Sequence, residues 1–224
     1  MIITPKNDYE HNRDYALRIV RENIINLEIK PGSLIGEQEI ANMLNLSRTP
    51  IHEAFLELSK SRIIEILPQK GCFVSYIEPE LISESRFLRR CVESAVVQET
   101  CDKATDSDLD ELDEIIRLQE FYNDKNSDKF LELDNDFHKV MYRICNKMQC
   151  YYMVSLMSMH FDRVRSLSLH AVKDHKIIQD HKAIAEAIRK RDKAQALAAF
   201  EKHMSRFDLD WSSIEAQYGE YIKE

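Results

Sequence analysis

The sequence predicts a mainly α-helical protein: an N-terminal domain of three helices plus a β-hairpin, followed by an all-α antiparallel helical bundle. Glycine and proline are scarce, 4 and 5 in 224 residues, which favours long helices and few tight turns. Apolar residues recur mostly at helical spacing, and the period changes to alternation only around residues 64–75. We expect two domains, residues 1–77 and 78–224.

The N-terminal domain begins with a helix over about residues 11–27, which Lys30-Pro31-Gly32 ends. A short helix over Glu37–Leu44 follows, and Asn45-Leu46 makes the next turn. Ser47 is well placed to cap a third helix, because its hydroxyl can accept from an unpaired N–H group of the first turn. Two helices joined by a short turn, the second with a polar, basic start, are typical of a helix-turn-helix.

A hairpin follows the third helix. Ile64 and Ile66, then Phe73 and Ser75, alternate around the turn Pro68-Gln69-Lys70-Gly71, and this pattern predicts two strands. The hairpin completes a winged helix-turn-helix. Beyond it, Glu78-Pro79-Glu80 resembles a linker.

From Leu81 onward the pattern predicts only helices, in about six segments. Thr105 or Ser107, Ser127 and Asp192 are expected to cap three of them. The breaks are expected near residues 105–107, 123–127, 146–149, 170–174 and 191–192.

The net charge of −8 argues against nucleic-acid binding at first sight. Residues 1–77 carry 9 Lys/Arg against 10 Asp/Glu, whereas the remainder carries 22 against 29. The acidity therefore lies mostly outside the predicted DNA-binding domain, and a local basic surface is what binds DNA.

No apolar run is long enough to cross a bilayer and the N-terminus is polar, so we expect a cytoplasmic protein without a membrane partner.

The segment from Pro31 to Ser75 closely resembles the GntR superfamily of bacterial transcription regulators. The similarity extends over roughly residues 13–77. The matching positions are Pro31-Gly32, Glu39, Ala41, Ser47-Arg48-Thr49-Pro50, Glu53-Ala54, Leu58 and Gly71. The resemblance implies double-stranded operator DNA as the partner.

A recognition helix reads DNA with its N-terminal residues in the major groove. The planar guanidinium of Arg48 suits N7 and O6 of guanine, although a lone surface arginine is more often simply solvated. Thr49 and the N-terminal backbone N–H groups suit phosphates. Lys70 at the wing tip could contact the DNA backbone or the minor groove, and Gly71 allows the wing to come close to the DNA.

Two positions depart from the family. His52 stands where arginine is usual, and Gln38 stands where a basic residue is common. Both remove positive charge, so we expect an unusual operator preference or more salt-sensitive binding. The predicted DNA-binding residues are Gln38, Ser47, Arg48, Thr49, His52, Lys70 and Gly71.

A second set of residues carries metal-ligand chemistry. Asp134 and His138 are four apart, so on a helix both project from one face. His181 and His203 lie on two later helices and could reach the same depth if those helices are antiparallel. One Asp and three His suit zinc, nickel, manganese or iron. The alternative is a surface ion pair beside solvated histidines.

Residues from about 80 to 207 resemble the FadR-type effector domain of the same superfamily, named FCD. The resemblance rests on Arg89…Glu93, LELDNDFH, Asn146 and the run DHKAIAEAIRKRDKAQALAAFEKH. Metal-binding members use one Asp and three His, which implies the ligands Asp134, His138, His181 and His203, with zinc preferred. Three other histidines match no ligand position and are expected to be solvent-facing or capping: His160, His170 and His175.

The resemblance also implies a pocket for a small organic acid beside the metal. Arg89 is the first candidate to pair with its carboxylate, because a guanidinium grips that group bidentately. Arg163 and Arg165 could line the same cavity, and Asn146 could supply an amide. Each arginine could instead form a salt bridge on the bundle surface.

These features together predict a homodimeric repressor or activator whose operator affinity responds to the acid. A metal-responsive regulator without an organic effector is the main alternative. A metal-dependent hydrolase is a remote one, because the sequence has no nucleophile elbow, phosphate loop or His-Glu-x-x-His motif. We therefore do not expect an enzyme.

Overall fold

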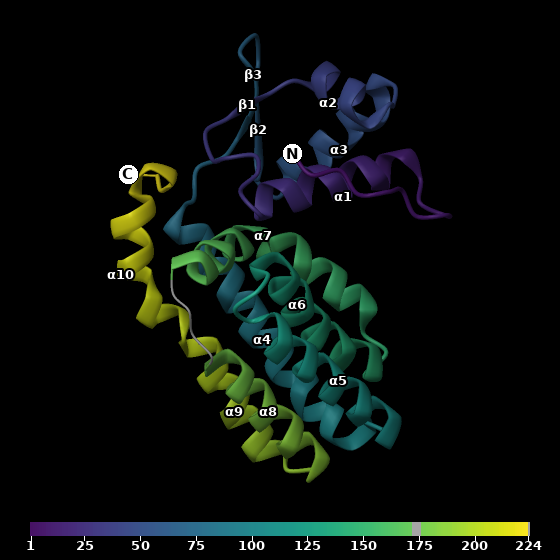
Figure 1. The fold of residues 1–224 in the computed structure, drawn as a ribbon, viewed down its shortest axis with the longest axis vertical. Coiled ribbons are helices and arrows are strands. Elements are labelled where there is room, and N and C mark those ends of the chain that lie inside the picture. The colour runs from purple at the N-terminus through teal and green to yellow at the C-terminus, as the bar shows by residue number, and fades with distance from the viewer. Residues whose placement is uncertain (172–175, 224) are drawn as a thin grey trace. The chain divides into compact units, whose positions relative to one another are not determined.

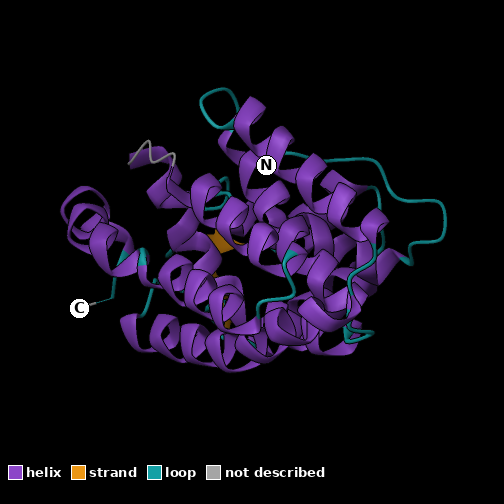
Figure 2. Cartoon of the chain, turned by 90° about the horizontal axis from the view of Figure 1, so that it is seen from below, coloured by secondary structure: helices purple, strands orange, loops and turns teal. Residues whose placement is uncertain are grey.

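The computed structural model describes residues 1–171 and 176–223, and the chain forms two compact units. One unit is Met1–Leu81 with Gly219–Glu224, and the other is Ile82–Tyr218. Figure 1 labels the elements of both units, and Figure 2 shows that helices dominate. The predicted fold class is confirmed: a winged helix-turn-helix with a small sheet, and a helical domain.

Three helices form the body of the first unit: α1 (Asn12–Ile25), α2 (Glu37–Leu44) and α3 (Arg48–Lys60). α1 and α2 both pack on α3. Their apolar faces are fully buried, and removing this apolar surface from water stabilises the arrangement. The residues with no exposed surface on α1 and α3 include Ala16, Ile19, Val20, Ile51, Ala54 and Phe55.

Ser47 precedes α3 at the N-cap position with extended backbone, but among the described residues its side chain makes no capping hydrogen bond. The prediction of Ser47 as the N-cap residue is confirmed, but the predicted hydrogen bond to its hydroxyl is not formed. The side chain is exposed, which leaves the Ser47 hydroxyl at the protein surface.

The wing is a sheet of three strands in the order β1-β3-β2, all antiparallel. The predicted hairpin corresponds to β2 (Ile64–Leu67) and β3 (Gly71–Val74), whereas β1 (Leu34–Ile35) was not predicted. Two residues are too few to show an alternating pattern. Gly71 has φ 111°, and a Cβ there would lie 2.9 Å from Cδ1 of Leu34. The positive φ, which L side chains rarely adopt, is what favours glycine here, since the Leu34 tip belongs to an exposed side chain that can move.

The end of the chain returns to the first unit. After the 3₁₀ turn η1 (Gly219–Tyr221), Ile222 forms a parallel bridge with Ile77. The Ile77 N–H donates to Tyr221 O over 2.8 Å, and Lys223 N–H donates to Ile77 O over 2.9 Å. Lys223 also pairs with Glu78 at 3.3 Å.

Within its described residues, the second unit consists of helices and the turns between them. Their bounds are α4 (Pro79–Lys103), α5 (Asp106–Tyr122), α6 (Ser127–Ile144), α7 (Met148–Ala171), α8 (Lys176–Arg189), α9 (Lys193–Ser205) and α10 (Phe207–Tyr218). Sequence analysis missed the break at Arg206, which no glycine or proline marks. The predicted break at 170–174 lies largely outside the described residues.

Side chains cap the N-termini of α5, α6 and α9. Thr105 and Asp108 form a reciprocal capping box at α5, and the carboxylate of Asp192 accepts from Gln195 N–H at α9. Both caps were expected. At α6 the capping residue is Asn126, which accepts from Lys129 N–H, rather than the predicted Ser127.

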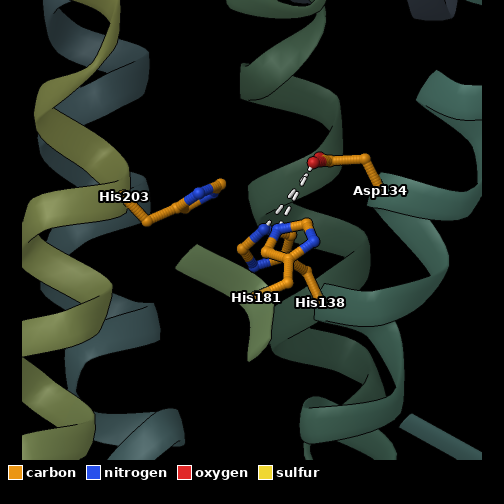
Figure 3. A group of neighbouring side chains, drawn as sticks. All are labelled: Asp134, His138, His181 and His203. Carbon is orange, nitrogen blue, oxygen red and sulfur yellow. Dashed lines mark ion pairs between the residues drawn. The ribbon is translucent and has the colours of Figure 1, made fainter. Parts of the chain in front are cut away.

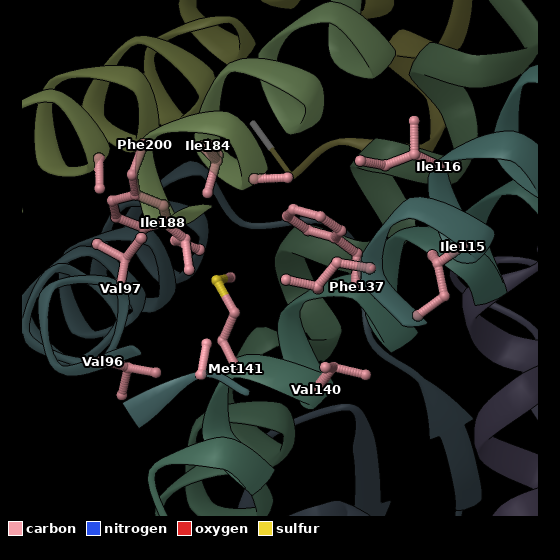
Figure 4. Packing of buried hydrophobic residues seen from close by; sticks show 14 of the residues in the cluster. Val96, Val97, Ile115, Ile116, Phe137, Val140, Met141, Ile184, Ile188 and Phe200 are labelled. Atoms are coloured by element: carbon pink, nitrogen blue, oxygen red, sulfur yellow. The ribbon is translucent and has the colours of Figure 1, made fainter. Parts of the chain in front are cut away.

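α6 runs through the middle of the apolar core (Figure 4). α5 and α7 pack against it, and α8 packs on both α5 and α9. Phe137 and Met141 of α6 meet Val97 of α4, Ile188 of α8 and Phe200 of α9, all buried. Asp134 and His138 lie on this same helix and are only 3% and 2% exposed. Within the described residues, no helix is long and apolar enough to span a membrane.

Candidate metal centre and nucleic-acid interface

The three helices α6, α8 and α9 bring Asp134, His138, His181 and His203 together (Figure 3). One ligand atom from each side chain lies within 4.8 Å of the others. His181 Nε2 is 3.4 Å from Asp134 Oδ1, and His138 Nε2 is 4.0 Å from Asp134 Oδ2. The three imidazole rings lie 4.8–5.6 Å apart between centroids. The four predicted ligands therefore converge on one point.

Two neighbours fix the orientation of the histidine rings. Glu93 Oε2 of α4 lies 2.9 Å from His138 Nδ1, and Gln119 Oε1 of α5 lies 2.9 Å from His181 Nδ1. The Gln119 contact is a hydrogen bond that occupies Nδ1 of His181 and leaves its Nε2 for the cluster, whereas Glu93 approaches Nδ1 of His138 at ion-pair distance without hydrogen-bond geometry. Phe137 stacks on His181 with centroids 4.1 Å apart. Partners of this kind commonly set the tautomer of a metal-binding histidine.

The environment keeps the histidines neutral. Burial lowers the pKa of His138, and it lowers the pKa values of His181 and His203 well below the usual range. Burial also opposes ionisation of Glu93, but the neighbouring groups, above all the charge of Arg89, outweigh it and hold the Glu93 pKa at about 2. A neutral imidazole is the form that binds a metal.

The ring nitrogens that point to the centre of the cluster, where they could bind a metal, lack hydrogen-bond partners. Within the described part of the chain, this holds for the buried atoms His138 Nε2, His181 Nε2 and His203 Nδ1. A buried, unsatisfied nitrogen is costly and calls for a partner. Three imidazole nitrogens and one carboxylate are a suitable set for a divalent transition metal. The residues present therefore fit such an ion.

A cavity of about 70 Å³ opens on this cluster at Asp134 and His203. One water needs roughly 10–15 Å³ on this scale, so the cavity has room for a few water-sized groups. Its cationic lining residues are Arg89, Arg165 and Arg206, and apolar side chains form most of the remaining wall: Phe130, Leu131, Phe161, Leu169, Ile177 and Met204.

The three cavity arginines each have a carboxylate partner. Arg89 Nε donates to Glu93 over 2.9 Å, and both side chains are buried. Arg165 contacts Asp134 and also donates to Asp162 over 2.8 Å. Arg206 pairs with Asp180, the residue before His181. Two of the three ion pairs thus involve a metal-cluster residue or its immediate neighbour.

Two predicted effector residues lie elsewhere. Arg163 is fully buried beside His160 Nδ1, at 3.0 Å, and is not among the described residues lining the cavity. Asn146 is exposed in the turn after α6 with φ 55°, a conformation that asparagine tolerates. It too lies outside the cavity lining. The structure therefore supports neither as an effector contact.

The remaining histidines correct another expectation. His160 is 2% exposed, rather than solvent-facing, because α7 places it on the same buried face as Arg163. His175 and the side chain of His170 lie outside the described residues.

Sequence analysis missed Gln119 and Arg206. Gln119 falls in register with the buried Leu112, Ile115 and Ile116 of α5, and a polar residue on an otherwise apolar face was a usable signal. Arg206 offered none, because it ends α9 at a break that sequence analysis did not detect.

The predicted DNA-reading residues lie at the surface of the first unit. Arg48 and His52, one turn apart on α3, have side chains 70% and 51% exposed. Thr49 is also exposed. Gln38 is exposed on α2 and donates to Asn42 over 3.0 Å. Lys70 is exposed in the wing turn before Gly71.

These elements define a winged helix-turn-helix protein with a separate helical domain. Residues 14–74 match the family described as bacterial regulatory proteins, gntR family, and residues 84–206 match the FCD domain. The chain belongs to the GntR family of bacterial transcription regulators and carries an FCD domain. It is a DNA-binding transcription regulator.

Similar proteins support this assignment. The repressor RspR of Escherichia coli K12 is 28% identical over 209 residues, 92% of each chain. The galactonate operon repressor of the same strain is 26% identical over 195 residues, 76% of this chain and 84% of its own. The solved structure of E. coli McbR/YncC has a TM-score of 0.81 at 17% identity, covering 93% and 99% of the two chains. The relatives are regulators rather than enzymes.

Proposed function

We propose that this regulator binds operator DNA with an affinity that a small organic acid controls, and that the acid binds beside a divalent metal in the helical domain. The observation that carries the proposal is the convergence of Asp134, His138, His181 and His203 on one buried point, with unpartnered donor atoms among the described residues. The adjoining cationic cavity supplies the place for the acid.

The four side chains would hold the metal, with zinc preferred and nickel, manganese or iron as alternatives. Four protein ligands leave room for further coordination when the ion takes five or six ligands. The bound ion would supply a positive centre for the carboxylate of the acid. Glu93 and Gln119 would keep His138 and His181 oriented whether or not acid is present.

Arg165 and Arg89 are the proposed contacts of the acid. Arg165 is the better placed of the two, because its side chain is 14% exposed while that of Arg89 is 5% exposed and paired with Glu93. An incoming carboxylate could take over the guanidinium of Arg165 from Asp134. The cavity volume of about 70 Å³ limits the acid to a few heavy atoms beyond that carboxylate.

On the DNA side, we propose that Ser47, Arg48, Thr49, His52 and Gln38 face the major groove while Lys70 and Gly71 of the wing approach the backbone. A cytoplasmic homodimer would present two such heads to a two-fold operator. Two of the similar proteins are named repressors, which supports repression as the mode of action.

A metal-responsive regulator without an organic effector is the second candidate. The observation in its favour is that the cavity is small and its arginines already have carboxylate partners. In that case the metal alone would change the DNA affinity. Binding of an acid to the metal-loaded chain would argue against it.

The test is metal analysis of the purified full chain, followed by thermal unfolding with and without small organic acids. Ligand at 100 times its Kd stabilises the folded state by about 2.7 kcal/mol. We expect an acid to raise the midpoint of the metal-loaded chain and not of the His203→Ala chain. An identical response in the two chains would refute the metal-dependent pocket.

A further inference from the structure

Glu37 makes two contacts that tie the second helix to the third. Its Oε2 accepts a hydrogen bond from Arg48 Nε over 2.6 Å, and its Oε1 lies 2.7 Å from His52 Nδ1. The Glu37 side chain is only 11% exposed, while its two partners are 70% and 51% exposed. One nearly covered carboxylate thus holds two exposed basic side chains.

We propose that Glu37 is a positioning residue for DNA reading, whose carboxylate holds Arg48 and His52 together in the orientation that meets the bases. This inference rests on the proposed DNA contacts of Arg48 and His52. Glu37 itself is not required to touch DNA.

The chemistry of the contacts determines what each side chain presents. Because Glu37 engages Nε of Arg48, the two terminal nitrogens remain for a bidentate partner such as guanine. An ionised carboxylate only accepts, so the Nδ1 of His52 carries the proton. Nε2 of His52 is then the ring atom that remains for a partner outside the protein.

The fixed arrangement reduces the cost of binding. An arginine side chain loses rotamer entropy when it binds, and part of this loss is already made when Nε is held. Burial opposes ionisation of Glu37, but the hydrogen bonds from His52 and Arg48 outweigh it and lower the Glu37 pKa. The carboxylate is therefore charged at neutral pH.

Glu39 provides a matched control. It lies in the same first turn of α2, carries the same charge and is exposed. Near DNA, removal of either negative charge should strengthen non-specific binding, because a phosphate repulsion disappears. A positioning role predicts that Glu37→Gln nevertheless weakens specific binding.

The experiment measures the affinities of the full chain for two duplexes, one selected from a random pool by the wild-type protein and one scrambled. We expect Glu37→Gln to reduce the ratio of the two affinities by about tenfold. Glu39→Gln should change this ratio by less than about twofold, since the reading side chains stay in place. Thermal unfolding confirms that each variant is folded at the assay temperature.

Two outcomes would overturn the inference. Glu37→Gln could leave the ratio unchanged, or it could reduce the ratio equally in a chain that also carries Arg48→Ala and His52→Ala. If Arg48→Ala and His52→Ala alone leave the ratio unchanged, the proposed DNA contacts fail and the role of Glu37 fails with them. If they reduce it while Glu37→Gln does not, only the positioning role fails.

Discussion

Gln119 and His181 lie 62 residues apart in the chain, yet Oε1 of Gln119 is 2.9 Å from Nδ1 of His181. The contact joins α5 to α8 at the candidate metal centre. Because the amide oxygen can only accept, it assigns the proton of the neutral ring to Nδ1 and leaves Nε2 for the cluster. A residue outside the ligand set thereby decides which nitrogen His181 offers.

Gln119→Ala should weaken metal binding by about 10- to 100-fold, the usual effect of losing a partner that orients a ligand. Competition with a chelator of known affinity measures this change for zinc. Gln149→Ala, at an exposed position early in α7, serves as the control and should have no effect. Equal zinc affinities for the two variants would show that Gln119 does not orient the ligand.

Arg89→Met should lower the free energy of unfolding by about 3–5 kcal/mol, because it leaves the buried carboxylate of Glu93 without its counter-charge. Denaturant unfolding of the metal-free chain is the measurement. The neighbouring Arg90→Met breaks a pair with Glu201 in which the arginine is 53% exposed, and it should cost under about 1 kcal/mol. Similar losses in both variants would contradict the buried pairing.

The capping box of α5 predicts a pH dependence. Hydrogen bonds from Thr105, with the charge of Arg143, lower the pKa of Asp108. A carboxyl group whose pKa is lower in the folded state stabilises that state above its ordinary pKa, and this contribution disappears as the pH falls through the folded value. Between about pH 5 and 3, the wild-type chain should therefore lose more stability than Asp108→Asn. Parallel unfolding curves over this range would exclude the effect.

Much of the fold could be predicted from the sequence because local signals agree with it. Helical spacing of the apolar residues, the Pro31-Gly32 turn and the alternation around Lys70 each point to the observed element. Strand β1 and the start of α10 were missed, because a two-residue strand has no period and Arg206 ends α9 without a breaker residue.

The metal cluster could be predicted from the sequence only in part. The spacing of Asp134 and His138 places both on one helical face. His181 and His203 were candidates only on the assumption that two later helices are antiparallel, and the family resemblance strengthened their assignment. The roles of Gln119 and Glu37 depend on contacts between helices, which spacing along one chain segment does not encode. Arg163 and Asn146 have suitable chemistry but do not line the described cavity, because sequence spacing does not show which side chains face it.

Arg48→Ala should strongly weaken operator-specific binding while the fold is kept, since the side chain is 70% exposed. Loss of one bidentate base contact costs about 1–3 kcal/mol of discrimination. A gel-shift titration on the selected duplex measures the change, with the scrambled duplex as the control. Unchanged affinity for the selected duplex would remove Arg48 from the reading surface.

The most direct test of acid-controlled operator binding is the affinity of the full chain for the selected duplex, measured with and without zinc and a panel of small organic acids. We expect at least one acid to change this affinity by about 5- to 150-fold, the usual range of allosteric coupling. The change should occur only in the zinc-loaded wild-type chain and should be absent in His203→Ala. An affinity that no acid alters, or that changes equally in His203→Ala, would contradict the proposed control of DNA binding.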